Sequence, residues 1–227
     1  MRVKIIQDPS AETFSKQLLD IGDGKVTIDE TGCVKLPTDF CTIINSKDAL
    51  IEQIFPDVHI QYINHEWLAE KEILSPKNVD VDDFNLKIQQ FLPGNLVSYK
   101  SIDIVCDASE AANFPTEILN SLDLPGIPLH NLQLNVGFPI ILLPSILNGK
   151  FRGENILIPR IPIIPTDVPI QFKRYQFPII LAFAMIINKS QGQTMSVCGL
   201  DLSTPCFSHG QLYVACSRVG KHPVCLC

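Results

Sequence analysis

Arg218 is the residue whose type and position best suit phosphate chemistry. Ser208 and Gln211 form an S-x-x-Q capping box, which predicts a helix that begins there and runs on through Arg218. Its apolar stripe would consist of Leu212, Ala215, Cys216 and Val219. Gln211 and Arg218, seven residues apart, would share another face, from which a guanidinium can offer two parallel N–H donors to phosphate oxygens. An exposed arginine without a ligand has the same spacing, so that alternative stays open.

A polar loop, residues 187–194 with the sequence INKSQGQT, follows a strongly apolar segment that predicts a strand. Ligands of α/β proteins bind at the carboxyl edge of the sheet, where such loops lie. Lys189 supplies a cation for a phosphate, and the residues after it supply hydrogen-bond donors. Because polar turns often follow strands and bind nothing, the loop alone is a weak signal.

Two other segments imitate sites but have the wrong spacing. Residues 22–30, GDGKVTIDE, contain a Gly-Lys pair, yet Leu19 stands where a phosphate loop needs its first glycine and Val26 where it needs Ser or Thr. We therefore expect a turn there. Cys206 and His209 are sequence neighbours at a helix start, which is poor geometry for a nucleophile and its base.

The eight cysteines do not predict a disulfide framework, because no CxxC occurs and the amino terminus has no apolar core of a signal peptide. We expect reduced thiols, no metal, and an intracellular, nuclear protein. A structural zinc site is the alternative, although the ligand spacing is missing. The longest apolar run, residues 177–187, is too short to cross a bilayer, so no membrane partner is expected.

Charge is distributed unevenly along the 227 residues. Residues 1–148 carry 10 Lys and Arg against 21 Asp and Glu, whereas residues 149–227 carry 8 against 3. A surface for a phosphate backbone, if there is one, therefore belongs to the last third, where the local field outweighs the net charge of −6. Ordinary scatter of charge along a chain gives the same asymmetry, and this alternative also stays open.

Periodic apolar residues predict the elements that position these segments. Helices are expected over residues 11–20 and from about Ser46. A third is expected up to Phe91, with Asn78 as its N-cap residue and Phe91 in its buried apolar stripe. After residue 149, apolar runs alternate with polar segments as strand, crossover and strand, which predicts a parallel α/β sheet.

The middle of the chain predicts a β-rich insert. Residues 96–100 and 101–105 predict strands, and residues 132–143, LQLNVGFPIILL, predict a β-hairpin or a small barrel. Dense prolines over residues 159–169 predict a rigid extended connection.

Residues 181–194, LAFAMIINKSQGQT, and 201–220, DLSTPCFSHGQLYVACSRVG, resemble 5′-to-3′ DNA helicases of superfamily 1, of the petite-integration-frequency (PIF) class and especially the Helitron-transposon type. In that family the first segment is similar to the motif that couples DNA contact to the nucleotide, and the second to the motif with the arginine finger. The resemblance implies that Arg218 is the arginine finger. The coupling residues would be Lys189, Ser190, Gln191, Gly192 and Gln211.

The same resemblance implies a second RecA-like helicase domain, a parallel sheet with helices, that carries a small and incomplete β-barrel insert. The chain would divide into a lead-in from a first RecA-like domain (1–70), the start of the second (71–114), the insert (115–149) and the remainder of the second (150–227). Lys77 and Asn78 become candidates for contacts with the nucleotide, although a strand end followed by a helix cap explains both residues as well.

Three departures from the family pattern stand out. Ile186 and Ile180 replace a threonine and an arginine, which removes polar groups from the coupling strand. A segment with further strands is missing between Leu143 and Phe151, so the insert is expected to be truncated. The last residues, 221–227 with the sequence KHPVCLC, also depart from the family.

The resemblance implies an ATP-dependent DNA helicase involved in DNA repair and recombination, but the sequence contains no phosphate-binding loop and no acidic motif for magnesium. We expect ATP and Mg²⁺ to bind only together with a first RecA-like domain, in cis or in trans, and the chain alone to be inactive. Single-stranded DNA would bind weakly. The alternatives are a truncated, transposon-derived module that binds nucleic acid or protein without turnover, and a relic that does not fold.

Overall fold

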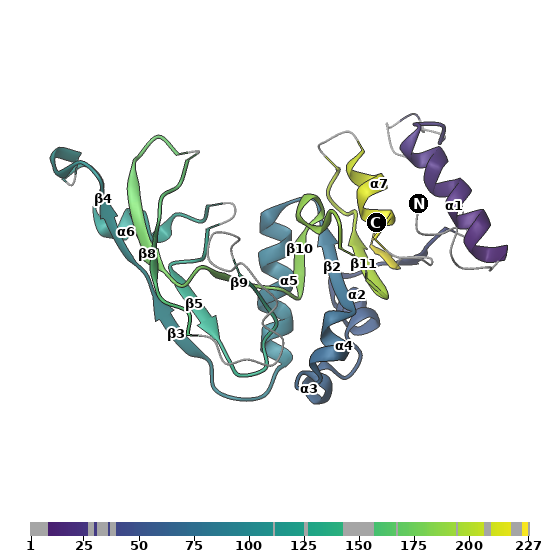
Figure 1. Ribbon diagram of the computed structural model, residues 1–227, viewed down its shortest axis with the longest axis horizontal. Helices are drawn as coiled ribbons and strands as arrows, with labels where there is room; N and C mark the ends of the chain where they lie inside the picture. The colour runs from purple at the N-terminus through teal and green to yellow at the C-terminus, as the bar shows by residue number, and fades with distance from the viewer. Residues whose placement is uncertain are drawn as a thin grey trace. The chain divides into compact units, whose positions relative to one another are not determined.

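The computed structural model describes residues 9–26, 30, 36, 40–110, 112–124, 127–142, 157–166, 168–193, 195–206, 210–218 and 224–226. The chain forms two compact units (Figure 1): unit 1 comprises Met1–Pro93 and Ala182–Cys227, and unit 2 comprises Gly94–Leu181. Unit 2 thus begins before and ends after the expected insert of residues 115–149. The residues before Lys71 fall in the same unit as the expected RecA-like sheet.

Unit 1 contains a five-stranded sheet in the order β1-β12-β11-β2-β10 (Figure 1). The strands are β1 (Thr42–Ile44), β12 (Val224–Leu226), β11 (Val197–Asp201), β2 (Lys71–Ser75) and β10 (Ala184–Ile186). Every neighbouring pair is parallel, which confirms the expected α/β class. The interior residues Ile73, Leu74 and Leu200 are fully buried, as is typical of a parallel sheet that is covered on both faces.

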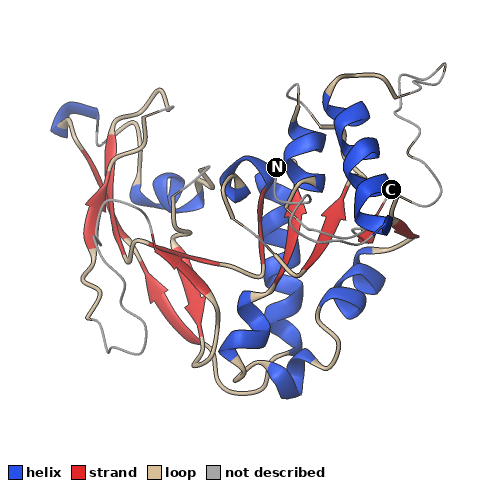
Figure 2. Ribbon diagram, turned by 45° about the vertical axis from the view of Figure 1, so that its right-hand side comes forward, coloured by secondary structure: helices blue, strands red, loops and turns tan. Residues whose placement is uncertain are grey.

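Helices cover the two faces of this sheet (Figure 2). Gly199 of β11 faces α2 (Lys47–Ile54), where a Cβ atom on the glycine would lie 2.9 Å from Ile54. The neighbouring Cys198 points to the opposite face, because side chains alternate along a strand. There burial raises the pKa of its thiol well above the ordinary value, and the nearby Cys216 of α7 (Gln211–Cys216) and the Arg218 guanidinium shift this pKa less. Helices α2 and α7 therefore lie on opposite faces of β11.

The remaining helices of unit 1 are α1 (Pro9–Gly22), α3 (Val58–Gln61), α4 (His65–Ala69), α5 (Asn78–Phe91) and the short 3₁₀ helix η3 (Ile187–Ser190). The predicted helix after Ser46 is confirmed as α2: Oγ of Ser46 accepts a hydrogen bond from the Ala49 amide at 3.1 Å and caps its first turn. The predicted first helix is confirmed as α1. Both helices have an apolar stripe that the local sequence alone specifies.

Helix α5 matches the predicted range, but two details of the prediction are wrong. Lys77, not Asn78, is the N-cap residue, and its side chain makes no capping bond. Phe91, the last residue of the helix, was expected in the buried stripe, yet it is 52% exposed. Val81, Phe84 and Ile88 are buried as expected.

The last strand, β12, comes from the tail that departs from the family pattern. Val224–Leu226 pairs in parallel with β1 on one side and with β11 on the other. Cys225 and Leu226 are buried in the sheet. These residues therefore complete the core of unit 1 despite their unfamiliar sequence.

Glu72 is a buried acid in β2, opposite Cys198 in the strand register. Burial raises its pKa from an ordinary 4.5 to about 8. The raised pKa means that the folded chain holds this proton more tightly than the unfolded chain. The stability that the proton provides is complete below about pH 4.5 and is lost as the pH rises through about 8.

We therefore expect Glu72→Gln to increase the free energy of unfolding at pH 9 relative to the wild-type chain, by on the order of 5 kcal/mol, and to change it little at pH 4.5. Denaturant unfolding at the two pH values measures the difference. Glu52→Gln, at an exposed position of α2, is the control. The same pH response in both variants would show that Glu72 does not carry the effect.

The described residues of unit 2 form three small antiparallel sheets. Their pairings are β3 (Val97–Lys100) with β5 (Asn131–Leu134), β4 (Ile102–Val105) with β8 (Phe172–Gln176), β8 with β7 (Ile161–Ile163), and β6 (Ile140–Leu142) with β9 (Ile179–Leu181). Two short helices accompany them, η2 (Ala108–Glu110) and α6 (Thr116–Ser121). The strands predicted over residues 96–105 are confirmed as β3 and β4.

Several predictions for this unit are wrong. Residues 132–143 do not form a hairpin, because β5 pairs with β3 and β6 pairs with β9. The run 177–185 is not one strand, since it is divided between β9 in unit 2 and β10 in unit 1. Strand β8 was not predicted. The expected gap between Leu143 and Phe151 lies outside the described residues, and a barrel-like insert stays a prediction.

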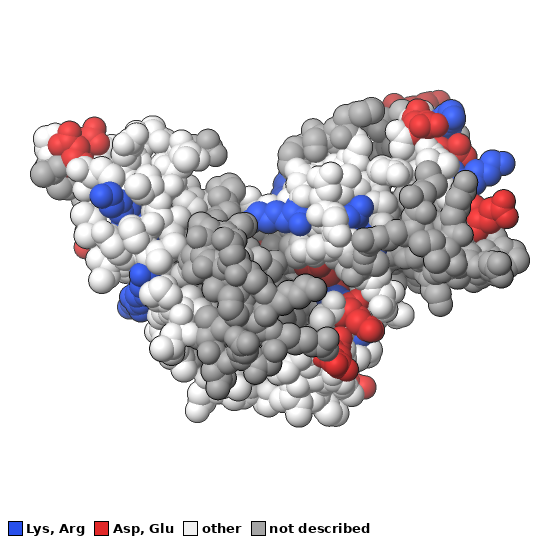
Figure 3. Space-filling view, viewed as in Figure 1, with Lys and Arg blue, Asp and Glu red and all other residues white. Residues whose placement is uncertain are grey.

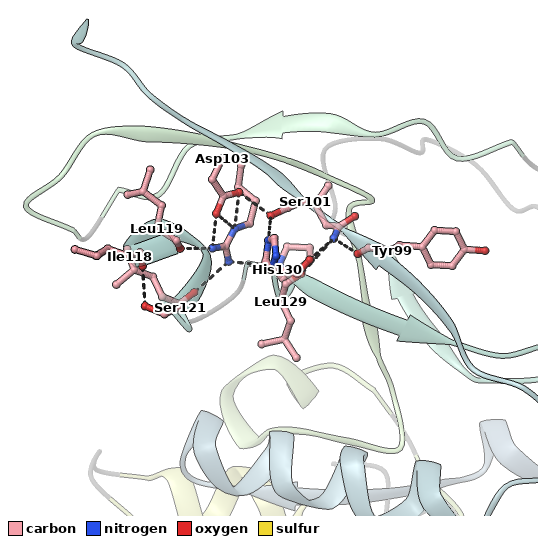
Figure 4. A network of polar contacts seen from close by, with 12 residues as sticks. Tyr99, Ser101, Asp103, Ile118, Leu119, Ser121, Leu129 and His130 are labelled. Atoms are coloured by element: carbon pink, nitrogen blue, oxygen red, sulfur yellow. Dashed lines mark hydrogen bonds and ion pairs between the residues drawn. The ribbon is translucent and has the colours of Figure 1, made fainter. Parts of the chain in front are cut away.

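A buried ion pair forms the polar centre of unit 2 (Figure 4). Nη2 of Arg174, in β8, lies 2.8 Å from Oδ2 of Asp103 in β4, and both side chains are at most 1% exposed. The other donors of the guanidinium reach backbone carbonyls of Leu119, Leu122 and Pro128. Arg174 thus ties two strands to the segment around α6.

The Asp103 carboxylate also accepts a hydrogen bond from the Ser101 hydroxyl, at 2.7 Å (Figure 4). Nδ1 of His130 lies 2.8 Å from the same hydroxyl. The Ser101 hydroxyl donates its proton to the Asp103 carboxylate, which is itself paired with Arg174. In this arrangement His130 does not accept that proton, so the serine is not activated as a nucleophile. The Ser-His pair is a structural contact.

Within the described ranges, six cysteines are free and no group of three His, Cys, Asp or Glu side chains could hold a metal ion. Over the same residues, the helices are too short or too polar for any of them to span a bilayer.

Candidate functional site

The candidate site begins with the loop after β10. This strand ends at Ile186, which is paired with Ser75 at the end of β2, so the loop leaves the carboxyl edge of the sheet as expected. Its first residues form η3, in which the buried Ser190 hydroxyl donates to the Ile187 carbonyl at 2.7 Å. Lys189 is exposed.

A turn closes the loop after η3. The Gln193 amide donates to the Ser190 carbonyl at 3.0 Å. Gly192 has a φ of 90°, in the left-handed region that glycine adopts at little cost. Gln191, Gly192 and Gln193 are exposed, so the turn presents its polar groups to solvent.

Helix α7 is shorter than the sequence predicts. It begins at Gln211, with Gly210 as N-cap at a φ of 78°, so the predicted start at Ser208 is wrong. Ser208 itself, like His209 and Val219, lies outside the described residues. Gln211, Ala215 and Cys216 are buried. The helix ends at Cys216, which leaves Arg218 in the turn that follows instead of on the helix.

Arg218 is nevertheless held firmly. Its backbone amide donates to Ala215, and its carbonyl accepts from the Met195 amide at 3.1 Å. Its Nε donates to the Val214 carbonyl at 2.9 Å, and Nη2 donates to Oγ of Ser217 at 2.6 Å. The backbone and the side chain of this arginine are both anchored by α7.

The guanidinium also contacts the polar loop. Nη1 of Arg218 donates to the carbonyl of Ser190 at 3.2 Å and, at a longer 3.4 Å, to that of Gln193. These bonds join two segments that are 25 to 28 residues apart in the chain. The structure thus brings together the arginine and the loop that the sequence singled out separately.

The other candidate residues occupy neighbouring positions. Lys77 and Asn78 follow the carboxyl end of β2, the strand beside β10, and Lys77 is exposed. Gln211 lies at the opposite end of α7 from Arg218 and is only 2% exposed. Gln211 is therefore a core residue of α7, and the exposed face that it was expected to share with Arg218 is not observed.

Sequence reasoning missed two polar groups. Ser217 accepts from Arg218 and donates to the Val214 carbonyl at 2.8 Å. Asp201, at the end of β11, is fully buried and accepts a hydrogen bond from the Ser75 hydroxyl at 3.1 Å. The Ser-Arg dipeptide is a weak signal for the first. No local pattern predicts the second, because its partner lies 126 residues away.

Not every described cation of the basic last third is available at a surface. Arg174 is completely buried against Asp103, and Arg218 is half-buried against the loop. Lys173 and Arg160 belong to unit 2, whereas Lys189 belongs to unit 1. Within each unit, the described lysines and arginines on the face drawn in Figure 3 are separate blue spots. The summed charge of residues 149–227 therefore overstates the cations available to a phosphate backbone.

The curated proteins that this sequence matches include ATP-dependent DNA helicases of the PIF type. The sequence is 48% identical over 52 residues to the ATP-dependent DNA helicase PIF1 of Candida albicans, which covers 23% of this chain and 6% of that protein. It is 30% identical over 165 residues to PIF1 of Rattus norvegicus, which covers 61% of this chain and 24% of the rat protein. No family model matches the sequence.

The solved structures that match this fold include Pif1 helicases. The crystal structure of the Candida albicans Pif1 helicase matches with a TM-score of 0.57 and 19% identity, over 95% of this chain and 53% of that one. A Pif1 helicase from Bacteroides in complex with ADP-AlF3 and ssDNA matches with a TM-score of 0.52 and 20% identity, over 96% of this chain and 49% of that one. At this identity the structural matches establish the fold alone.

The parallel sheet and these fold matches define an α/β protein, consistent with a RecA-like domain. Its relatives are ATP-dependent DNA helicases of the PIF type, and the chain is consistent with a carboxy-terminal portion of such a helicase, as the sequence resemblance indicated. The chain spans about a quarter or less of the curated relatives named above and about half of the solved structures.

Proposed function

We propose that this chain is the second motor half of a PIF-type DNA helicase, in which Arg218 is the arginine finger and residues 187–193 couple DNA contact to ATP hydrolysis. The observation that carries the proposal is the direct contact between the Arg218 guanidinium and the Ser190 and Gln193 carbonyls. A residue that acts on the nucleotide and a loop that acts on DNA must be mechanically connected if one is to control the other.

The chemistry of Arg218 supports its role. Its guanidinium is permanently charged, is anchored at the end of α7, and has a planar set of donors that suits phosphate oxygens. When ATP is bound, such a group stabilises the negative charge that develops on the γ-phosphate during transfer. Lys77 and Asn78, at the adjoining strand end, are weaker candidates for contacts with the nucleotide.

In this proposal ATP and Mg²⁺ bind only when a first RecA-like half, in cis or in trans, supplies the phosphate loop and the magnesium ligands. The described residues of this chain offer no cluster that fits the metal. Single-stranded DNA would contact the exposed part of the loop, around Lys189, with low affinity because few cations are available there. A related Pif1 helicase was crystallised with ssDNA, which supports this choice of partner.

The test compares the chain alone with a fusion to the first half of a PIF-type helicase. We expect no ATP turnover from the chain alone and ssDNA-stimulated turnover from the fusion, because an arginine finger assists only an assembled phosphate site. A coupled assay of phosphate release measures both. Turnover by the carefully purified chain, or a fusion that folds but ignores ssDNA, would contradict the proposal and favour a binding module without turnover.

A further inference from the structure

The Arg218 guanidinium is almost fully engaged by its own chain. Nε bonds to the Val214 carbonyl, Nη1 to those of Ser190 and Gln193, and Nη2 to the Ser217 hydroxyl. A guanidinium has five N–H donors, so one is left. A bidentate contact with phosphate oxygens needs two parallel donors. In this geometry Arg218 therefore cannot make a bidentate contact with a phosphate until at least one of its present bonds is broken.

Ser217 determines how the guanidinium is held. Its Oγ donates to the Val214 carbonyl at 2.8 Å and accepts from Nη2 of Arg218 at 2.6 Å. The first bond points the hydroxyl back along α7, and the second turns the guanidinium toward it. Because Nε of Arg218 bonds to the same Val214 carbonyl, the two side chains converge on one acceptor. The hydroxyl thus directs Nη1 to the loop.

We propose that Ser217 is a positioning residue that holds Arg218 in a parked position on loop 187–193, and that DNA contact with the loop releases the arginine to the phosphate. The proposal rests on the proposed function of Arg218 and adds how the site is kept inactive without DNA. The parked bonds end on backbone carbonyls of the loop, so any movement of the loop breaks them. Lys189, Gln191 and Gly192 are among the exposed residues of the loop that DNA could contact.

The first test uses the chain as it is and needs no activity. The Gln193 amide donates to the Ser190 carbonyl, so its hydrogen exchange reports the order of the parked loop. We expect Arg218→Ala to accelerate this exchange at least threefold and Ser217→Ala about twofold. These effects are modest because each lost hydrogen bond contributes only a small net free energy. Ser121→Ala, which removes a similar bond from Oγ to the Ile118 carbonyl at the end of α6, should leave it unchanged.

Exchange at Gln193 that is unaltered in both variants would overturn the parked position. Equal acceleration by Ser121→Ala would also overturn it, because the loop would then be responding to a general loss of stability.

The second test measures ATP turnover in the fusion with and without ssDNA. We expect Ser217→Ala to raise the DNA-free rate about two- to tenfold, the effect of one lost hydrogen bond, and to leave the DNA-saturated rate within about twofold. A fall in the DNA-saturated rate alone would show that Ser217 supports the active position and would overturn the inference. Equal falls in both rates, with a lower melting temperature, would give Ser217 a structural role only.

The two tests separate the two proposals. If Arg218→Ala leaves turnover of the fusion unchanged, the arginine-finger assignment fails, whereas the exchange experiment still decides whether Arg218 holds the loop. If Arg218→Ala abolishes turnover but Ser217→Ala changes neither exchange nor the DNA-free rate, the assignment stands and the parked position fails.

Discussion

Replacing Arg218 by alanine in a fusion that carries a phosphate loop is expected to lower ATP turnover by on the order of a thousandfold. In the proposed function, the group that would be lost is a permanent cation that stabilises the charge developing on the transferring phosphate. Arg218→Lys should restore little, since an ammonium keeps the charge but has no planar fork of donors. Steady-state turnover at saturating ATP and ssDNA is the measurement.

The control for this prediction is Arg160→Ala, which removes an exposed arginine of unit 2. It should leave turnover within about twofold, as substitutions at exposed surface positions usually do. Thermal unfolding of each variant, measured beside turnover, separates chemistry from stability. An alanine variant of Arg218 with full turnover would refute its catalytic role. Turnover that falls only in proportion to the folded fraction would make the arginine a structural residue.

Arg174→Met should destabilise unit 2 by about 3–5 kcal/mol, because it leaves the Asp103 carboxylate buried without its partner. Three backbone carbonyls lose their donors in the same substitution. The double variant Asp103→Leu with Arg174→Met removes both charges and should recover part of the loss. Hydrogen exchange of the paired amides of β4 and β8 reports the stability of this unit.

Arg160→Met makes the same chemical change at an exposed arginine in unit 2 and should cost less than about 1 kcal/mol. The single tryptophan, Trp67, lies in unit 1, and its fluorescence follows that unit separately. We expect the Trp67 transition to move little in Arg174→Met. If the β4 and β8 amides exchange as slowly in Arg174→Met as in the wild-type chain, the ion pair does not hold unit 2 together.

The local sequence determined the helices with strong apolar periodicity and the two polar segments whose residues could carry chemistry. Helices α1, α2 and α5 appear where apolar periodicity predicts them, and Ser46 caps α2 as expected, because both signals act within a few residues of the chain. The same holds for the polar loop after β10, which leaves the carboxyl edge of a parallel strand as expected. The resemblance to PIF-type helicases rests on residues 181–194 and 201–220 and is supported by the relatives found.

Only the tertiary structure decided which strands pair and which charges are available. Residues 132–143 have the pattern of a hairpin, yet β5 and β6 pair with strands more than 30 residues away, because pairing depends on a register between distant segments. Arg174 and Arg218 both add to the basic charge of the last third. Arg174 is buried in an ion pair, and Arg218 donates hydrogen bonds to the loop. Neither outcome can be read from the residue type, because burial and bonding partners are set only in the folded chain.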